Sequence, residues 1–259
     1  MLAVALVAMA LVTPVLPPAR TDALPASFYA DATVRSHGGI ALIGDSLTFA
    51  AWSDLPQRFE EQQWGPFQFE VRSARFTVTT TESATSGLDA VRRLKQGGFD
   101  PPIWIVALGT NDAGPTYGVD GAAAALIDAM MAVIGAGHRV VWVNVYKRGS
   151  PSSTAAFNAA LEAATARHPG LAIADWHSVV AANTDWLTDD GVHLNLAGSI
   201  ERNRFLAQAA LAFASLVCDP APTTTTTPTP TATATATARA TSVGNAAAAT
   251  LPAVRLCHR

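Results

Sequence analysis

Residues 40–48 read Ile-Ala-Leu-Ile-Gly-Asp-Ser-Leu-Thr, and the rest of the chain is interpreted around this stretch. Its four apolar residues predict a short buried strand that ends at Gly44, and residues 50–63 have the apolar spacing of a helix. Ser46 is therefore expected at the carboxyl end of a strand. Open α/β sheets bind ligands there, and a helix start offers free N–H groups. Asp45 and Ser46 are also favoured helix caps, so this stretch alone leaves both interpretations open.

Strand-like apolar runs alternate with helix-like segments from residue 39 to residue 217. The strands are expected at residues 40–43, 67–71, 103–108, 140–145 and 171–174, and the later helices at 88–95, 122–134, 153–167 and 196–217. Strands separated by long helices need crossover connections, which give a mainly parallel sheet covered on both faces. We predict one α/β domain over residues 39–218, a three-layer α/β/α sandwich around a five-stranded parallel sheet.

Composition argues against a nucleic-acid partner and against a structural zinc site. The 259 residues carry a formal net charge of −3 without a cluster of Lys and Arg, so no nucleic-acid partner is expected. The two cysteines, Cys218 and Cys257, form no CxxC motif and no ligand cluster with histidine, so no structural zinc site is expected. In an exported chain these two cysteines could form a disulfide.

The two ends of the chain differ from the domain in composition. Residues 1–16 are almost wholly apolar, which suits the core of a signal peptide better than a membrane span. No positive residue precedes this core, so an uncleaved membrane anchor is the alternative for residues 1–38, which also include a linker. Residues 219–259 are predicted to be a disordered Thr/Pro/Ala-rich tail or stalk, because residues 219–241 carry no large apolar group to bury. We expect a secreted or envelope-associated protein.

A second polar stretch, Leu-Gly-Thr-Asn-Asp at residues 108–112, follows the strand predicted at 103–108. Parallel strands of one sheet end at the same edge, so Asn111 is expected beside Ser46. Its side-chain amide is a suitable hydrogen-bond donor to an oxyanion. Asn-Asp followed by Ala-Gly-Pro is also typical of a turn, and both interpretations can hold together.

A third stretch, residues 187–195, lies in a loop that leads into the last helix. Asp190 precedes His193 by three residues, a spacing that lets the carboxylate accept the Nδ1 proton and leaves Nε2 free to take another. A serine hydroxyl is a poor nucleophile without such a base. His177, two residues after an aspartate, is a rival, and capping of the last helix by Asp190 or Asn195 is the structural alternative.

Gly87 opens the helix predicted at 88–95. A glycine there lets the backbone approach a ligand and presents its N–H outward, although an ordinary helix cap has the same sequence.

In chain order, these motifs resemble those of the SGNH (GDSL) hydrolases: Gly44-Asp45-Ser46-Leu47, then Gly87, then Gly109-Thr110-Asn111-Asp112, then Asp190-Gly191-Val192-His193. The resemblance implies a flavodoxin-like sandwich and a serine esterase or acyl-transfer mechanism without metal or cofactor. It assigns Ser46 as nucleophile, His193 as general base and Asp190 as its orienting carboxylate. It also implies three oxyanion donors, which are the backbone N–H groups of Ser46 and Gly87 and the Asn111 side chain. No GxSxG motif surrounds Ser46, which separates the chain from the ordinary α/β-hydrolases.

These observations predict an exported serine esterase or deacylase that cleaves carboxylic esters of short acyl groups such as acetyl, with cell-envelope glycans as candidate substrates. Two alternatives stay open: an O-acyltransferase that moves the acyl group to a wall polysaccharide, and a non-catalytic wall or glycan-binding module. The expected partner is a small-molecule or glycan ester, and membrane contact is expected only through an N-terminal anchor. The sequence does not predict the oligomeric state.

Overall fold

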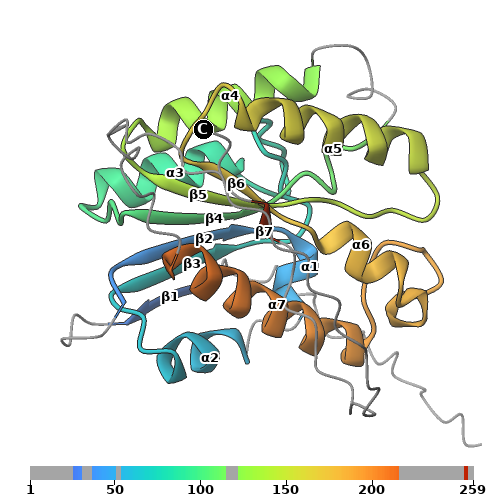
Figure 1. Ribbon diagram of the computed structural model, residues 1–259, viewed down its shortest axis with the longest axis horizontal. Helices are drawn as coiled ribbons and strands as arrows, with labels where there is room; N and C mark the ends of the chain where they lie inside the picture. Colours follow the sequence, from blue (N-terminus) through green and yellow to red (C-terminus); the bar gives the residue numbers. More distant parts are fainter. Residues whose placement is uncertain (1–25, 31–36, 51–53, 115–121, 216–253, 256–259) are drawn as a thin grey trace, which may run out of the picture.

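The computed structural model describes residues 26–30, 37–50, 54–114, 122–215 and 254–255 (Figure 1). The apolar leader, most of the Thr/Pro/Ala-rich tail and both cysteines lie outside the described residues, so their assignments stay predictions. In the part of the chain that the structure describes, no helix is both long and apolar enough to cross a membrane.

The described strands form one sheet in the order β1-β3-β2-β4-β5-β6-β7. The predicted five-stranded parallel sheet is confirmed, and its strands are β3 (Phe67–Val71), β2 (Ile40–Gly44), β4 (Ile103–Ala107), β5 (Arg139–Val143) and β6 (Leu171–Ala174). Two antiparallel edge strands, β1 (Ala26–Ala30) and β7 (Val254–Arg255), were not predicted. They are short and lie in segments assigned to the leader and the tail, where no apolar periodicity marks them.

The order of the parallel strands is that of flavodoxin-like folds. Numbered among themselves, they run 2-1-3-4-5, because the chain leaves β2 for β3 on one side and then crosses to β4 on the other. The carboxyl ends of β2 and β4 therefore flank the switch point of the sheet. Ser46 follows β2 and Asn111 follows β4, so both lie at the position where such sheets bind ligands.

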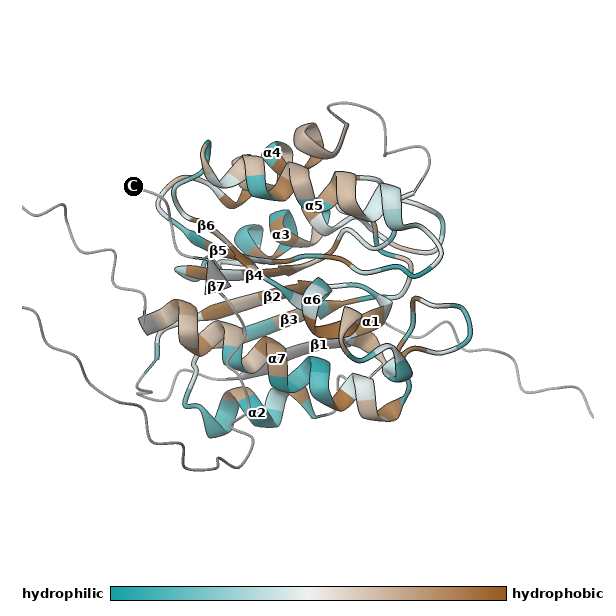
Figure 2. Ribbon diagram, turned by 45° about the vertical axis from the view of Figure 1, so that its right-hand side comes forward, coloured by the Kyte–Doolittle hydropathy of each residue, from teal (hydrophilic) through white to brown (hydrophobic). Residues whose placement is uncertain are grey.

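Helices cover both faces of the sheet and complete the predicted three-layer sandwich (Figures 1 and 2). One face carries α3 (Gly87–Gln96), α4 (Ala122–Ile134) and α5 (Pro151–Thr165). The other carries α1 (Ser46–Phe49), α2 (Leu55–Glu61), α6 (Trp176–Ala181) and α7 (Leu196–Ser215), with a 3₁₀ turn, η1, at Thr184–Trp186. The helix expected over residues 50–63 is shorter than predicted, because α2 begins at Leu55.

The central strands are buried on both faces. Every residue of β2 and β4 is buried, and Figure 2 shows the hydrophobic residues along these strands. Successive residues of a strand point to opposite faces, so Ile40 and Leu42 pack into one core while Ala41 and Ile43 pack into the other. This two-sided burial explains why the strand sequences are continuously apolar instead of alternating.

Candidate active site

Ser46 is the first residue of α1 and follows β2 after a single intervening residue. The Asp45 carboxylate caps this helix by accepting a hydrogen bond from the Leu47 N–H at 3.0 Å. Gly44 allows the strand to turn directly into the helix, since a Cβ there would lie 2.8 Å from the Thr48 Cβ. The capping interpretation thus holds for Asp45, and it leaves the Ser46 hydroxyl available to other groups.

A hydrogen-bonded chain connects three side chains at this edge of the sheet. The Ser46 Oγ lies 3.0 Å from the His193 Nε2, although the two residues are 147 positions apart. The His193 Nδ1 lies 2.6 Å from the Asp190 Oδ2. With Nδ1–H donating to the carboxylate, Nε2 is the acceptor for the serine proton. The hydrogen bond from His193 holds the pKa of Asp190 well below its usual range, so the carboxylate stays ionised.

The Asp190 carboxylate is fixed by its own loop. Its Oδ1 accepts hydrogen bonds from the backbone N–H groups of Val192 and His193 and from the Thr188 hydroxyl, each at 2.9 Å. The capping alternative applies instead to Asn195, whose Oδ1 accepts from the Gly198 N–H at 3.0 Å at the start of α7. The loop therefore occupies Oδ1 of Asp190 and leaves Oδ2 to accept the hydrogen bond from the imidazole.

The rival histidine has a structural role. Asp175, two residues before His177, caps α6 by accepting from the Ser178 N–H at 3.1 Å, and it accepts from the Asn144 amide at 2.8 Å. The His177 ring lies 5.3 Å from the ring of Tyr146, between centroids. Within the described residues, the His177 ring makes no hydrogen bond to a serine hydroxyl, unlike the His193 ring.

Asn111 lies in a turn after β4 that is held from several sides. Its Nδ2 donates to the Arg75 carbonyl at 2.9 Å, which uses one of the two amide hydrogens. The neighbouring Asp112 carboxylate is buried and accepts from the Thr77 N–H at 3.0 Å and the Thr77 hydroxyl at 2.8 Å. Burial raises the pKa of Asp112 to about 6. The turn and the oxyanion-donor interpretations are thus compatible, because the turn directs the amide.

The prediction that Gly87 is an oxyanion donor is wrong. Its N–H donates to the Phe76 carbonyl at 2.9 Å and is not available to a ligand. Gly87 is buried, and a Cβ at this position would lie 2.2 Å from the Leu108 Cδ1. Only glycine fits at position 87, because α3 packs closely against Leu108 in the segment after β4. The sequence does not show this contact, since a glycine at a helix start looks the same with or without it.

Another backbone N–H lies at the same edge. Ala74 follows β3 by three residues, and β3 pairs with β2 so that Val71 is opposite Gly44. Ala74 is exposed and has a φ of 56°, a left-handed conformation uncommon for alanine. Its N–H makes no hydrogen bond to any described residue. Sequence reasoning missed this position because alanine carries no signal for such a turn.

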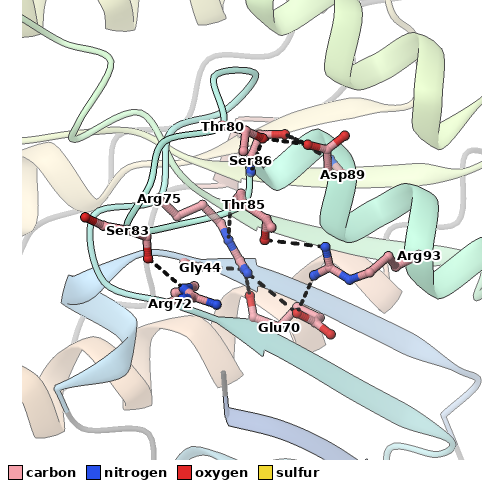
Figure 3. A network of polar contacts seen from close by, with 10 residues as sticks. All are labelled: Gly44, Glu70, Arg72, Arg75, Thr80, Ser83, Thr85, Ser86, Asp89 and Arg93. Atoms are coloured by element: carbon pink, nitrogen blue, oxygen red, sulfur yellow. Dashed lines mark hydrogen bonds and ion pairs between the residues drawn. The ribbon is translucent and has the colours of Figure 1, made fainter. Parts of the chain in front are cut away.

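Arg75 connects the elements around this N–H (Figure 3). Its buried guanidinium donates to the carbonyls of Glu70, of Thr85 at 3.2 Å and of Gly44 at 3.5 Å, and it pairs with the Glu70 carboxylate at 3.5 Å. Burial lowers the pKa of Arg75 to about 10, which leaves it charged at neutral pH. Since its own carbonyl accepts from Asn111, Arg75 links the end of β2, the Ala74 turn and the Asn111 turn.

A second buried arginine affects the charge of Asp45, the residue that precedes the nucleophile. Arg202 on α7 is buried, and its guanidinium lies 5.1 Å from the Trp176 ring centroid. Burial raises the pKa of Asp45, and the positive charge of Arg202 opposes that shift. The charge on Arg202 therefore favours the ionised carboxylate that caps α1 at Ser46.

Among the described residues, no group of three or more His, Cys, Asp or Glu side chains could hold a metal ion. A serine hydroxyl bonded to an aspartate-held imidazole, at the switch point of a parallel α/β sheet, is the arrangement of a serine hydrolase. Residues 42–199 match the family described as GDSL-like lipase/acylhydrolase, and the chain belongs to this family. The predicted resemblance is thereby confirmed.

Solved structures share the fold. The chain is similar to the C-terminal catalytic domain of Streptococcus pneumoniae peptidoglycan O-acetyltransferase A, with 21% identity, a TM-score of 0.52 and coverage of 69% of this chain and 92% of that one. A carbohydrate esterase family 3 protein from Talaromyces cellulolyticus is 18% identical, with a TM-score of 0.51 and coverage of 68% and 97%. A lipolytic G-D-S-L family protein from Veillonella parvula is 16% identical, with a TM-score of 0.51 and coverage of 67% and 96%. No curated protein matches the chain.

Proposed function

We propose that this protein is a serine esterase or deacylase that transfers the acyl group of a carboxylic ester to Ser46 and then to water. The observation that carries the proposal is the continuous hydrogen-bonded chain from Asp190 through His193 to Ser46, with distances of 2.6 and 3.0 Å. Each of the three side chains has the chemistry that its place in this chain requires.

The proposed reaction has two half-reactions. The Ser46 Oγ forms a bond to the ester carbonyl carbon while its proton moves to the His193 Nε2. The tetrahedral intermediate then breaks its bond to the alcohol oxygen, which takes the proton from His193 and leaves. In the second half-reaction, His193 removes a proton from water while the water oxygen forms a bond to the acyl carbon. The new tetrahedral intermediate then breaks its bond to the Ser46 Oγ, which takes the proton from His193, and the carboxylic acid leaves.

Three donors are proposed for the oxyanion: the backbone N–H groups of Ser46 and Ala74 and the side chain of Asn111. The Ser46 N–H lies in the first turn of α1, where backbone donors have no partner within the helix. Ala74 replaces Gly87 in this role because its N–H makes no hydrogen bond to any described residue and follows the strand beside β2. The second amide hydrogen of Asn111 is the remaining donor.

We further propose export and a short acyl group, such as acetyl, on a cell-envelope glycan as the substrate. The apolar leader and the Thr/Pro/Ala-rich tail in the sequence support an extracellular location. The same acyl-enzyme would acylate a sugar if a glycan hydroxyl replaced water, so the residues of the site serve both hydrolysis and transfer. The acceptor therefore has to be measured.

The test compares release of p-nitrophenol from p-nitrophenyl acetate by the full chain and by Ser46→Ala, with and without an oligosaccharide acceptor. We expect Ser46→Ala to fold and to lose turnover. Acetylated oligosaccharide among the products identifies transfer, whereas acetate alone identifies hydrolysis. Turnover by Ser46→Ala equal to that of the unaltered protein would overturn the proposal, and no release above the buffer rate by the unaltered protein would favour a non-catalytic module.

A further inference from the structure

Two adjacent basic residues after β5 reach the two loops that carry the proposed site. The Lys147 Nζ donates to the carbonyls of Thr110 at 3.2 Å and of Ala113 at 3.0 Å. The Arg148 Nη2 donates to the carbonyls of Thr188 at 3.2 Å and of Asp189 at 3.0 Å. One short segment thus contacts both the turn after β4 and the loop before α7.

The contacted carbonyls surround the functional side chains. Thr110 and Ala113 lie on either side of Asn111-Asp112, so Lys147 closes that turn from one side. Thr188 and Asp189 directly precede Asp190. The Asn111 turn and the Asp190 loop belong to distant parts of the chain, and the Lys147-Arg148 segment joins them by side-chain hydrogen bonds.

The backbone strengthens the second connection. The Arg148 N–H donates to the Gly191 carbonyl at 2.9 Å. Gly191 has a φ of 68°, and a Cβ there would lie 2.8 Å from the Arg148 Cβ. The positive φ and the lack of a side chain therefore let the Asp190 loop pack directly on Arg148.

Both cations are used as hydrogen-bond donors to main-chain carbonyls. Neither Lys147 nor Arg148 has a carboxylate within ion-pair distance among the described residues. Hydrogen bonds from charged donors are stronger than those between neutral groups. The Asn111 turn contains no helix or strand, and the Asp190 loop contains only the isolated bridge between Leu187 and Leu194, which does not reach the Asn111 turn. The bonds from Lys147 and Arg148 are therefore well placed to set the separation of the two loops.

From these contacts we propose that Lys147 and Arg148 form a strap that fixes the Asn111 turn relative to the Asp190–His193 loop. Both are positioning residues for acyl transfer at Ser46, and the inference rests on the proposed function. The strap holds the oxyanion donor and the general base at the two sides of the nucleophile. A displacement of about 1 Å between reacting groups can cost about 100-fold in rate, so such a constraint is measurable.

The experiment measures kcat and KM for p-nitrophenyl acetate in the full chain. The variants are Arg148→Ala, Arg148→Lys, Lys147→Met and the double variant Lys147→Met/Arg148→Ala. Arg204→Ala is the matched control, because Arg204 is an exposed arginine of α7 that pairs only with Glu201 among the described residues. Circular dichroism and the thermal midpoint report folding, and Lys147→Gln replaces Lys147→Met if the latter does not fold.

We expect Arg148→Ala and Lys147→Met each to lower kcat about tenfold or more, with KM within about twofold of that of the unaltered protein. Arg148→Lys should restore most of kcat, because an ammonium can still donate to one of the carbonyls. The double variant should lose less than the product of the single losses, because breaking either side of the strap already releases the two loops from each other. A role confined to stability would lower the thermal midpoint without this pattern in kcat.

Two results would overturn the strap. One is a loss of kcat in the double variant equal to the product of the losses in Lys147→Met and Arg148→Ala. The other is a kcat equal to that of the control in both Lys147→Met and Arg148→Ala. Ser46→Ala in the same assay separates this outcome from failure of the proposed function. If Ser46→Ala is inactive while the strap variants keep full kcat, only the strap is refuted. If Ser46→Ala remains active, the proposed function itself is wrong.

Discussion

Replacing Asp190 by asparagine should inactivate the enzyme more than replacing it by alanine. The Oδ1 of Asp190 accepts three hydrogen bonds from its loop, and Oδ2 accepts one from the His193 Nδ1. An asparagine amide has one acceptor oxygen and one NH₂ group that only donates. The three loop donors hold the amide oxygen at the Oδ1 position, so the NH₂ group faces His193.

The imidazole must then accept at Nδ1 and carry its proton on Nε2. Nε2 lies 3.0 Å from the Ser46 Oγ, and in this tautomer it cannot take the hydroxyl proton. In Ser-His-Asp enzymes the wrong tautomer lowers kcat about 10⁴-fold, which corresponds to about 5 kcal/mol of transition-state stabilisation. We expect a loss of this size in Asp190→Asn, with folding stability close to that of the unaltered protein because the loop hydrogen bonds are kept.

Asp190→Ala loses the loop hydrogen bonds but imposes no tautomer on His193. We therefore expect it to be less stable than Asp190→Asn, by about 1 kcal/mol, and yet more active. The assay is kcat for p-nitrophenyl acetate together with urea unfolding, and ¹⁵N chemical shifts of the imidazole report the tautomer. Equal or higher kcat in Asp190→Asn than in Asp190→Ala would refute the argument that the loop donors orient the amide.

Three further predictions follow from the surroundings of the site. Asn111→Ala should lower kcat about 100- to 1000-fold with little change in KM, and unchanged initial rates would exclude it as an oxyanion donor. Gly87→Ala should destabilise the fold by about 1 to 3 kcal/mol in urea, because its Cβ meets Leu108, while kcat per folded molecule stays the same. The raised pKa of Asp112 means that the native state holds its proton more tightly than the unfolded state. The stability that this proton contributes is present below pH 3.8 and is lost as pH rises to about 6. Relative to Asp112→Asn, the unaltered protein should lose up to about 3 kcal/mol across this window, and a pH-independent difference in unfolding free energy would contradict the assignment.

The sequence could predict the features that depend on residues close together in the chain, namely the buried strands and the Asp190–His193 pair. Strands β2 and β4 were predictable because a strand buried on both faces must be apolar throughout, and polar residues follow each strand where it leaves the core. Asp190 and His193 were predictable as a pair because three residues of loop suffice to bring a carboxylate to an imidazole. The strand order and the direction of parallel strands then place Ser46 and Asn111 at one edge of the sheet.

The proposed second backbone donor and the proposed strap depend on tertiary structure alone. A glycine at a helix start has the same sequence whether its N–H meets a ligand or its missing side chain admits a neighbouring Leu108, and here the latter holds. Ala74 has its left-handed conformation within a turn beside an arginine buried between strands and loops. The side chains of Lys147 and Arg148 donate to carbonyls that lie 34 to 41 positions away in the sequence. Each of these roles depends on contacts between residues distant along the chain, which short-range residue patterns do not encode.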